Sequence, residues 1–273
     1  MKDLLVGNWG YSRSIGLPVT IAIENFFPAT LELTIVAMII AVVIGFALGL
    51  VSALNNGKWS DFLSRGISIE SVSLPPFWIG IVFSLLFFFI GQYGLPTLPL
   101  DGRISQTLLL QNPVQPITGM FLIDSLLRGN IPFFVNALLH IILPALTLSL
   151  FPMGLIARTV RASVLDVLSQ DHIVFALSKG LSRRTLITRH VIKNSLIAVL
   201  TILGLIFAVL LSGSVLVETV FAWPGMGQWA ATSITSNDTA GIMGFTIVSA
   251  SIFVFINLVV DIAYIFIDPR IRY

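Results

Sequence analysis

The residues with the most marked chemistry in this sequence are basic side chains gathered in one segment, Arg158 to Ser195. Ser169 or Asp171 is placed to cap a short helix there, and Gly180 stands where a residue in the left-handed conformation would end that helix. Ser182 can cap a second helix behind the glycine. The pattern predicts a helix–glycine–helix arrangement with a basic rim, which suits an acidic binding partner.

The first of these predicted helices has an apolar face made of Ile173, Ala176 and Leu177. A short amphipathic helix between two membrane spans needs something to cover such a face. One interpretation is a separate protein that binds the loop. The alternative is an ordinary basic cytoplasmic loop that packs on the rest of its own chain.

Three acidic residues and a histidine lie within or beside strongly apolar stretches. Glu32 and Glu70 lie near the ends of their stretches, where we expect them to reach headgroups or water. Asp261 shares a helical face with Asn257, so it is a candidate either for contact with a transported solute or for pairing inside the protein. A single histidine such as His140 is typical of a hydrogen bond between helices, and we expect no metal site.

Two proline-containing motifs are candidates for shaping or gating a pathway. Pro75 and Pro76 interrupt an apolar stretch and predict a kink, which acts either as a hinge or only in packing. The segment ETVFAWPGMG begins at Glu218 and contains a turn at Trp223 and Pro224. That turn is either a tight re-entry at the membrane interface or an ordinary turn in the aromatic belt.

Enzyme motifs are missing from the sequence: there is no phosphate-binding loop, no H-E-x-x-H and no G-x-S-x-G. The absence of cysteine excludes disulfides and thiolate metal sites. We therefore expect no catalysis and no cofactor on this chain. If ATP drives its function, the nucleotide site must lie on another chain.

The elements that carry these residues must lie in a membrane. Of the 273 residues, 56% are apolar and only 10% are charged, against about 25% charged in soluble domains. A spanning helix needs about 20 apolar residues, and five segments qualify. The predicted fold is an all-α integral membrane protein, a polytopic bundle of five spans that follow an extracytoplasmic segment (1–29). The spans are expected near 30–54, 67–91, 134–156, 192–217 and 244–267, and the third is interrupted by His140, Pro144 and Pro152.

The distribution of basic residues predicts the orientation of the spans. With five spans, eleven Lys and Arg residues fall on one side and four on the other. The richer side, predicted to be cytoplasmic, holds Lys58, Arg65, Arg158, Arg161, Lys179, Arg183, Arg184, Arg189, Lys193, Arg270 and Arg272. The N-terminus is then outside and the C-terminus inside. The small net charge of +2, spread over several loops, indicates no nucleic-acid partner.

Several stretches together resemble one family of transport proteins. DHIVFALSKGLSRRTLITRHVIKNSL, from Asp171, is similar to the cytoplasmic "EAA" loop of ABC-importer permeases, and more narrowly to that of the dipeptide, oligopeptide and nickel permeases. PATLELTI, ETVFAWPGMG and NLVVDIAYIFIDPRIRY agree with the first of the two dissimilar permeases in these systems. The resemblance covers nearly the whole chain.

This resemblance implies a transmembrane domain (30–273) that forms half of a pathway for peptides in a bacterial plasma (inner) membrane. It implies partners: a related second permease, two cytoplasmic ATP-binding subunits that hydrolyse ATP, and an extracytoplasmic substrate-binding protein. The loop (158–193) would dock on the ATPase through Asp171, His172, Ala176, Lys179, Gly180, Arg183 and Arg184. Arg189, His190 and Asn194 match the second half of the motif. Pathway or gating candidates are Pro75, Pro76, Glu218, Trp223, Pro224, Asn257 and Asp261.

The sequence departs from the family pattern in the loop and at its start. Val174 and Phe175 stand where the motif has Glu and Ala, His172 replaces a Tyr, and Ala198 replaces a proline. Docking is therefore expected to use apolar shape and backbone approach rather than an ion pair. Family members begin with a further spanning helix, so we expect a truncated or misassigned start, or else a variant without that helix.

Two other functions remain open at the level of the sequence. A nickel or metal-chelate importer of the same family would share every motif named above. A secondary transporter driven by an ion gradient would use Asp261, although such proteins typically contain two related halves and no repeat is visible here.

Overall fold

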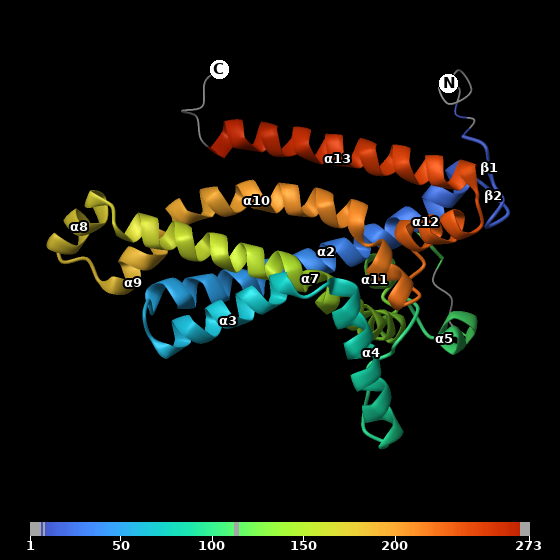
Figure 1. The fold of residues 1–273 in the computed structure, drawn as a ribbon, viewed down its shortest axis with the longest axis horizontal. Coiled ribbons are helices and arrows are strands. Elements are labelled where there is room, and N and C mark those ends of the chain that lie inside the picture. The colour runs from blue at the N-terminus through green and yellow to red at the C-terminus, as the bar shows by residue number, and fades with distance from the viewer. Residues whose placement is uncertain (1–6, 8, 112–114, 268–273) are drawn as a thin grey trace. The chain divides into compact units, whose positions relative to one another are not determined.

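Helices make up most of the described structure. The computed structural model describes residues 7, 9–111 and 115–267, and the chain order of the elements can be followed in Figure 1. The short elements are β1 (Tyr11–Ser12), β2 (Leu17–Pro18), α5 (Gln106–Gln111), α6 (Phe121–Leu127), α8 (Asp171–Ser178), α9 (Arg183–Thr185), the π-helix η1 (Leu186–Val191), α11 (Val215–Val220) and α12 (Met226–Thr235). The long ones are α2 (Val19–Leu54), α3 (Trp59–Ser73), α4 (Pro76–Gln92), α7 (Ile131–Leu168), α10 (Ile192–Gly213) and α13 (Thr239–Ile267).

The chain divides into two compact units. The first contains Met1–Ala37, Pro75–Leu148 and Val209–Val254. The second contains Met38–Leu74, Ser149–Ala208 and Phe255–Tyr273. Each unit is therefore built from segments that are distant in the sequence.

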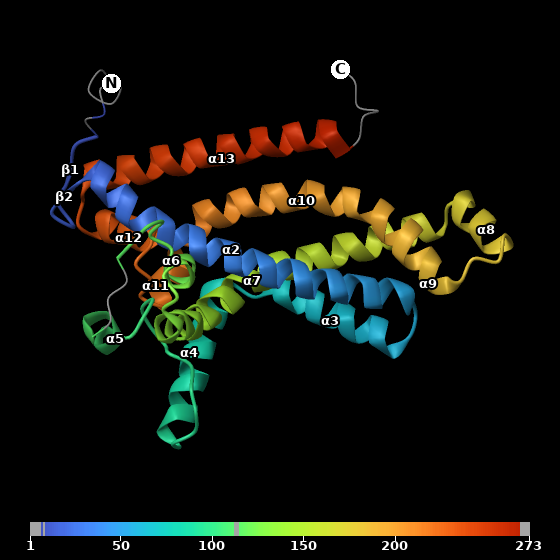
Figure 2. The ribbon, with the colours of Figure 1, turned by 180° about the vertical axis from the view of Figure 1, so that it is seen from behind.

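The core of the first unit forms where α2 begins. Val19 and Ala22 are fully buried, and they cluster with Met226 and Trp229 of α12. Phe26 stacks on Trp229 with 6.0 Å between the ring centroids. β1 and β2 pair antiparallel, Tyr11 opposite Pro18, and lie beside α12 in both Figure 1 and Figure 2.

In the second unit, small residues allow three helices to approach closely. A Cβ on Gly49 of α2 would lie 2.5 Å from the carbonyl oxygen of Ala157 in α7. A Cβ on Gly154 of α7 would lie 2.5 Å from the carbonyl oxygen of Ser68 in α3. Contacts this short exclude any larger side chain, so the two glycines fix how α2, α7 and α3 pack.

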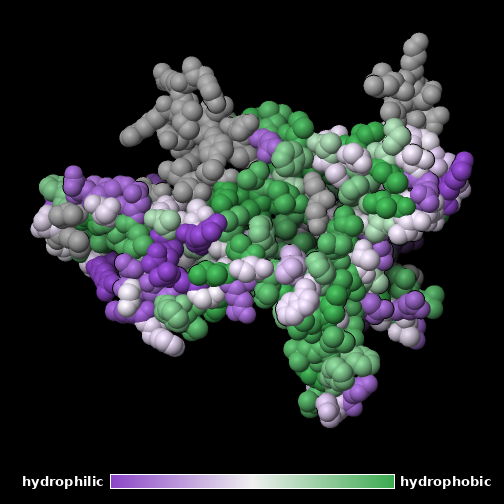
Figure 3. All heavy atoms as spheres, viewed as in Figure 1, coloured by the Kyte–Doolittle hydropathy of each residue, from purple (hydrophilic) through white to green (hydrophobic). Residues whose placement is uncertain are grey.

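Three described helices are long and apolar enough to cross a membrane, namely Val19–Leu54, Ile131–Leu168 and Thr239–Val259. The pair α3 and α4 adds a fourth if it counts as one broken span. The apolar part found in α10, Ile202–Leu211, is shorter, so a crossing by the predicted fourth span (192–217) stays a prediction. Figure 3 shows hydrophobic residues over the visible face of α4 and hydrophilic ones over the α8–η1 segment.

Several helices begin or end at other residues than the bounds expected for the spans. α2 begins at Val19 and not near Thr30, because the packing of its first turns on α12 keeps the chain helical through Pro28. α7 runs unbroken from Ile131 to Leu168, with Pro144 and Pro152 inside it. The predicted kinked helix (67–91) is instead two helices. Leu74 and Pro75 are extended between them, with ψ of 133° and 130°, since Pro76 disfavours the helical conformation in the residue before it.

Candidate functional site

The segment predicted to contact an ATPase contains a short helix with two different faces. In α8, Ile173 is buried and Ala176 is 6% exposed, whereas Phe175 is 61% exposed. Asp171 and His172 are exposed at its start. The Lys179 Nζ lies 4.5 Å from the centroid of the Phe175 ring, a cation–π contact at the exposed edge of the helix.

Behind α8 the chain turns at a glycine in the left-handed region. Gly180 has φ of +77°, and a Cβ built on it would meet no atom within 4 Å. Ser182 caps α9, accepting a hydrogen bond from the Thr185 amide at 3.3 Å. Arg183 and Arg184 are exposed on α9. The segment thus offers an aromatic side chain, an open backbone position and a basic patch on one short stretch of chain.

The second half of the loop continues as a π-helix. Leu186 and Val191 of η1 are buried, while Arg189 is exposed and His190 is half-buried. π-Helical turns inside α-helices often mark functional sites. The side chains of Val174, Asn194 and Ala198 lie outside the described part of the structure.

The turn at Trp223 and Pro224 surrounds a buried carboxylate in the first unit. Glu218 of α11 is fully buried, and its Oε1 accepts hydrogen bonds from Thr30 Oγ1 at 2.8 Å and Ser214 Oγ at 2.6 Å. Its Oε2 accepts one from the Gln228 amide at 3.0 Å. Burial raises the pKa of Glu218, and these hydrogen bonds act in the opposite direction.

Two glycines of the turn leave room for that carboxylate. A Cβ on Gly225 would lie 2.5 Å from Glu218 Oε2, and one on Gly227 would lie 2.9 Å from it. Trp223, 1% exposed, donates through Nε1 to the Ala29 carbonyl at 2.9 Å. The PATLELTI and ETVFAWPGMG stretches therefore join at one site. Glu218 and Trp223 are buried in that joint, where neither side chain is open to a solute.

Glu32 was predicted to reach headgroups or water, and that prediction was wrong. It is 4% exposed and forms an ion pair with Arg103, with 2.6 Å between Glu32 Oε2 and Arg103 Nη2. Glu32 Oε1 also accepts the Leu122 amide hydrogen bond at 2.7 Å. The Arg103 guanidinium stands 3.8 Å above the Phe121 ring. A carboxylate that is removed from water needs a partner for an ion pair or hydrogen bonds. Arg103, in the long loop (92–133), is that partner for Glu32.

The other predicted residues are scattered. Pro75 is exposed and Pro76 half-buried, where α3 and α4 are separated. Asn257 is half-buried on α13, and the side chain of Asp261 lies outside the described part of the structure. Glu70 is exposed, in agreement with its prediction. His140 Nδ1 pairs with the Asn136 carbonyl one turn earlier in α7, at 2.8 Å, and so not between helices as predicted.

The long loop (92–133) is also held in place by residues that were not predicted from the sequence. Asp124 is fully buried and accepts the Ile117 amide at 3.1 Å and the Gly119 amide at 3.0 Å. It also accepts the Thr118 amide at 2.9 Å and the Thr118 hydroxyl at 2.7 Å. The only sequence signal for these positions was their charge, because charged residues are rare in this chain.

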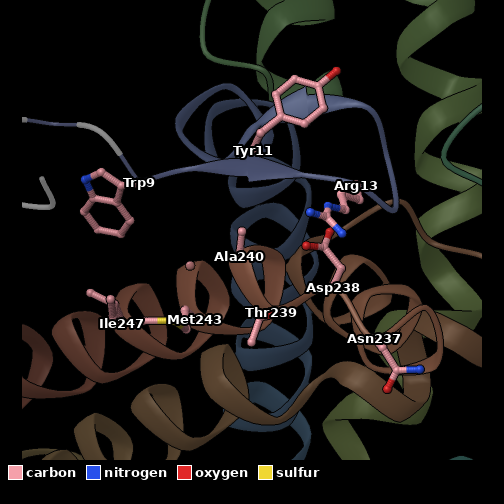
Figure 4. Close-up of a pocket in the computed structure, with 10 residues that line it drawn as sticks. Trp9, Tyr11, Arg13, Asn237, Asp238, Thr239, Ala240, Met243 and Ile247 are labelled. Carbon is pink, nitrogen blue, oxygen red and sulfur yellow. The ribbon is translucent and has the colours of Figure 1, made fainter.

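A fourth buried carboxylate fastens the β1–β2 hairpin. Asp238 accepts hydrogen bonds from Ser12 Oγ at 2.5 Å and Ser14 Oγ at 2.9 Å. It lines an open pocket of about 350 Å³ together with Trp9, and in Figure 4 the Arg13 side chain points toward its carboxylate. Burial acts to raise the pKa of Asp238, but hydrogen bonds from Ser12, Ser14 and Gly241 outweigh it and lower the pKa to about 2.

We expect this hairpin to loosen in acid. Because the folded pKa of Asp238 lies below the ordinary value of about 3.9, its stabilisation is complete above pH 4 and is lost as the pH falls toward 2. The protection of the amides of residues 9–17 against hydrogen exchange, taken relative to the intrinsic exchange rate at each pH, should fall over that range. In D238N this protection should be low already at pH 7 and change little on acidification. Equal exchange in both proteins would contradict the prediction.

Comparison with known proteins identifies the family to which this chain belongs. The model of the binding-protein-dependent transport system inner membrane component matches residues 45–273. The chain is 44% identical to the probable D,D-dipeptide transport system permease protein DdpB of Escherichia coli K12, over 99% of the chain and 78% of that protein. It is 40% identical to the dipeptide permease DppB of Alkalihalophilus pseudofirmus, over 100% of the chain and 80% of the relative. The putrescine export permease SapB of E. coli K12 is 34% identical, over 98% and 82%.

Two solved structures share the fold. An amino acid ABC transporter described with histidines matches with a TM-score of 0.60, at 14% identity, over 90% of this chain and 94% of that one. An inward-facing methionine transporter, MetNI, matches with a TM-score of 0.62, also at 14% identity, over 88% and 93%. At such low identities, these matches show only that the helical architecture is shared.

Proposed function

Because the chain belongs to the family of binding-protein-dependent transport system inner membrane components, we propose that it carries short peptides across the bacterial inner membrane as half of an ATP-driven import pathway. It is a permease subunit of an ABC transporter. The observation that supports the peptide cargo is the 44% identity to a D,D-dipeptide permease along 99% of the chain.

The proposed assembly contains three kinds of partner for this chain. A related permease supplies the other half of the pathway, two ATP-binding subunits contact the α8 segment from the cytoplasm, and an extracytoplasmic protein delivers the peptide. The N-terminus lies outside and the C-terminus inside. Closure of the ATPases on ATP pulls the two α8 helices together, and the permeases change from inward-open to outward-open by rigid-body motion.

A polyamine is the second candidate cargo. The 34% identity to a putrescine export permease shows that the family fold accommodates chemically different solutes. None of the relatives named above is a nickel permease, so peptide remains the preferred cargo over a metal chelate. Uptake of labelled dipeptide, labelled putrescine and labelled nickel by a deletion strain carrying this transporter distinguishes the three. Uptake of dipeptide alone is the expected result, and uptake of putrescine or nickel without dipeptide would overturn the proposed cargo.

The contact with the ATPase can be tested at Gly180, because asparagine tolerates its left-handed backbone while adding a side chain. G180N fits the isolated chain, where space around the Cβ is open, but intrudes on any partner that approaches the backbone. We expect dipeptide uptake and co-purification of the ATPase to fall by about tenfold or more, the result of losing at least 1.4 kcal/mol of binding.

Gly57, in the turn between α2 and α3, offers a matched control. Its φ is +76°, and a Cβ there would also meet no atom within 4 Å. G57N therefore imposes the same backbone demand without touching the α8 segment, and it should transport normally. Uptake by G180N within twofold of the wild type would rule out close docking at Gly180, whatever the cargo.

A further inference from the structure

The second unit contains a cavity of about 440 Å³ between α2, α3 and α7. Its walls combine apolar side chains with arginines. Leu48, Ile69 and Val72 supply apolar surface, and Arg65, Arg158 and Arg161 supply positive charge. A cavity with both kinds of wall suits a ligand that has an anionic group attached to a hydrocarbon part.

Only one of the three arginines is neutralised. Arg161 Nε lies 3.1 Å from Asp61 Oδ1 and its Nη2 lies 3.2 Å from Asp61 Oδ2, a bidentate ion pair. The Asp61 carboxylate accepts a further hydrogen bond from Ser52 Oγ at 2.5 Å. This pairing holds α7 to the first turn of α3, and it fixes one wall of the cavity.

Arg65 and Arg158 have no such partner. Both are exposed, and neither has a hydrogen bond or ion pair within the described ranges 9–111 and 115–267. Arg65 follows Asp61 by one helical turn on α3, and Arg158 precedes Arg161 by one turn on α7. The cavity therefore carries two uncompensated positive charges beside a neutral pair.

The apolar surface next to these charges continues outside the cavity. On α3, Ile69 is 63% exposed and Ile67 is 39% exposed, and both follow Arg65 along the helix. Gly49 and Gly154 line the cavity where the backbones of α2, α7 and α3 approach closely. Ile69 lines the cavity and is exposed, so its apolar surface is open to a ligand beside the two arginines.

We propose that this cavity binds an anionic phospholipid, with the phosphate between Arg65 and Arg158 and an acyl chain along Ile69. Basic pockets between transmembrane helices on the cytoplasmic side are suited to anionic headgroups. The distribution of Lys and Arg predicts that both arginines lie on that side. The proposal depends on the insertion of this chain in a membrane and is independent of the cargo.

The test measures lipid bound to the purified full transporter complex by native mass spectrometry. Phosphatidylglycerol and phosphatidylcholine are titrated separately. We expect phosphatidylglycerol to bind more tightly to the wild type, and R65Q/R158Q to weaken that binding about thirtyfold, roughly fivefold for each arginine near the surface. The single variants R65Q and R158Q should each weaken the binding of phosphatidylglycerol about fivefold. The double variant K58Q/K193Q removes two charges from the same predicted side but outside the cavity, and should bind as the wild type does.

Three results would overturn the proposal. One is unchanged phosphatidylglycerol binding in R65Q/R158Q, and another is an equal loss in K58Q/K193Q, which would indicate unspecific attraction of charge. The third is displacement of the lipid by an equimolar amount of glycerol phosphate or of dipeptide, which would assign the cavity to a soluble anion. R65K/R158K keeps both charges and should retain the lipid. If R65Q/R158Q loses the lipid only because it misfolds, its melting temperature will lie below that of R65K/R158K. Dipeptide uptake that fails while lipid binding persists would count against the proposed cargo alone.

Discussion

Replacing Glu218 with alanine should destabilise the permease more than almost any other single change around the turn at Trp223 and Pro224. The alanine removes the acceptor for three donors that are held in a buried site, on Thr30, Ser214 and Gln228. Each buried donor left without a partner costs about 1–3 kcal/mol. We expect a loss of about 3 kcal/mol or more in the free energy of unfolding, measured as thermal unfolding of the full chain in nanodiscs.

Glutamine at the same position separates hydrogen bonding from charge. In E218Q the amide oxygen can accept the Gln228 hydrogen bond, while its NH₂ group donates to the hydroxyls of Thr30 and Ser214, which are acceptors as well as donors. E218Q should therefore unfold within about 1 kcal/mol of the wild type at neutral pH. Similar losses in E218Q and E218A would show that the negative charge, and not the hydrogen-bond network, stabilises the turn.

The pH dependence of the two proteins should differ in a definite direction. Burial raises the pKa of Glu218, so the folded protein holds its proton more tightly than the unfolded chain does. The contribution of this group to stability is then complete below the unfolded value of about 4.3 and is lost as the pH rises from there through the raised pKa of the folded state. E218Q has no proton to lose there, and its stability should lack this fall.

The features that were predicted best are those that depend on residues close together in the sequence. Gly180 follows a short amphipathic segment, and the structure has a helix there whose Ile173 and Ala176 are buried. The long apolar stretches became long helices because composition alone determines whether a segment can lie in lipid. These two residues are buried within this chain, and contact of the exposed side of α8, where Phe175 lies, with another chain stays a prediction.

Prolines misled the prediction because their effect depends on what surrounds them. Pro144 and Pro152 are accommodated inside α7, where they are enclosed by packed helix, whereas Pro75 and Pro76 separate two helices. In membrane helices, neighbouring helices and side chains can satisfy the carbonyl groups that a proline leaves unpaired. No local pattern distinguishes the two cases.

The partners of the buried carboxylates could not be predicted from the sequence, for a different reason. Thr30 and Glu218 are 188 residues apart, and Asp61 and Arg161 are 100 apart. A single sequence shows that each carboxylate lies in an apolar context, and hence that it needs a partner, but it does not identify the partner. The pathway roles of Glu218 and Trp223 were predicted without knowing that both side chains are buried and hydrogen-bonded to α2.

The ion pair of Glu32 and Arg103 should be the other most sensitive position. R103A leaves the Glu32 carboxylate 4% exposed with the Leu122 amide as its remaining partner. Removing one member of a buried pair typically costs about 3–5 kcal/mol, because the other charge stays buried without compensation. We expect a melting temperature about 10 °C lower for the full chain in nanodiscs, together with faster proteolysis within residues 92–133. Arg128, which is exposed in the same loop and donates to the Gln115 carbonyl, provides the control R128A, whose effect should be below about 0.5 kcal/mol.

A double replacement tests whether the uncompensated charge is the cause. In E32Q/R103M both charges are gone, the glutamine oxygen can still accept the Leu122 hydrogen bond, and the methionine fills part of the space over Phe121. A buried ion pair replaced by groups of similar volume is often neutral for stability, so the double variant should be more stable than R103A although it carries one more substitution. If E32Q/R103M is as unstable as R103A or less stable, the loss comes from the contacts of Arg103 with Phe121 and Gly119, and the charge of Glu32 has little part in it.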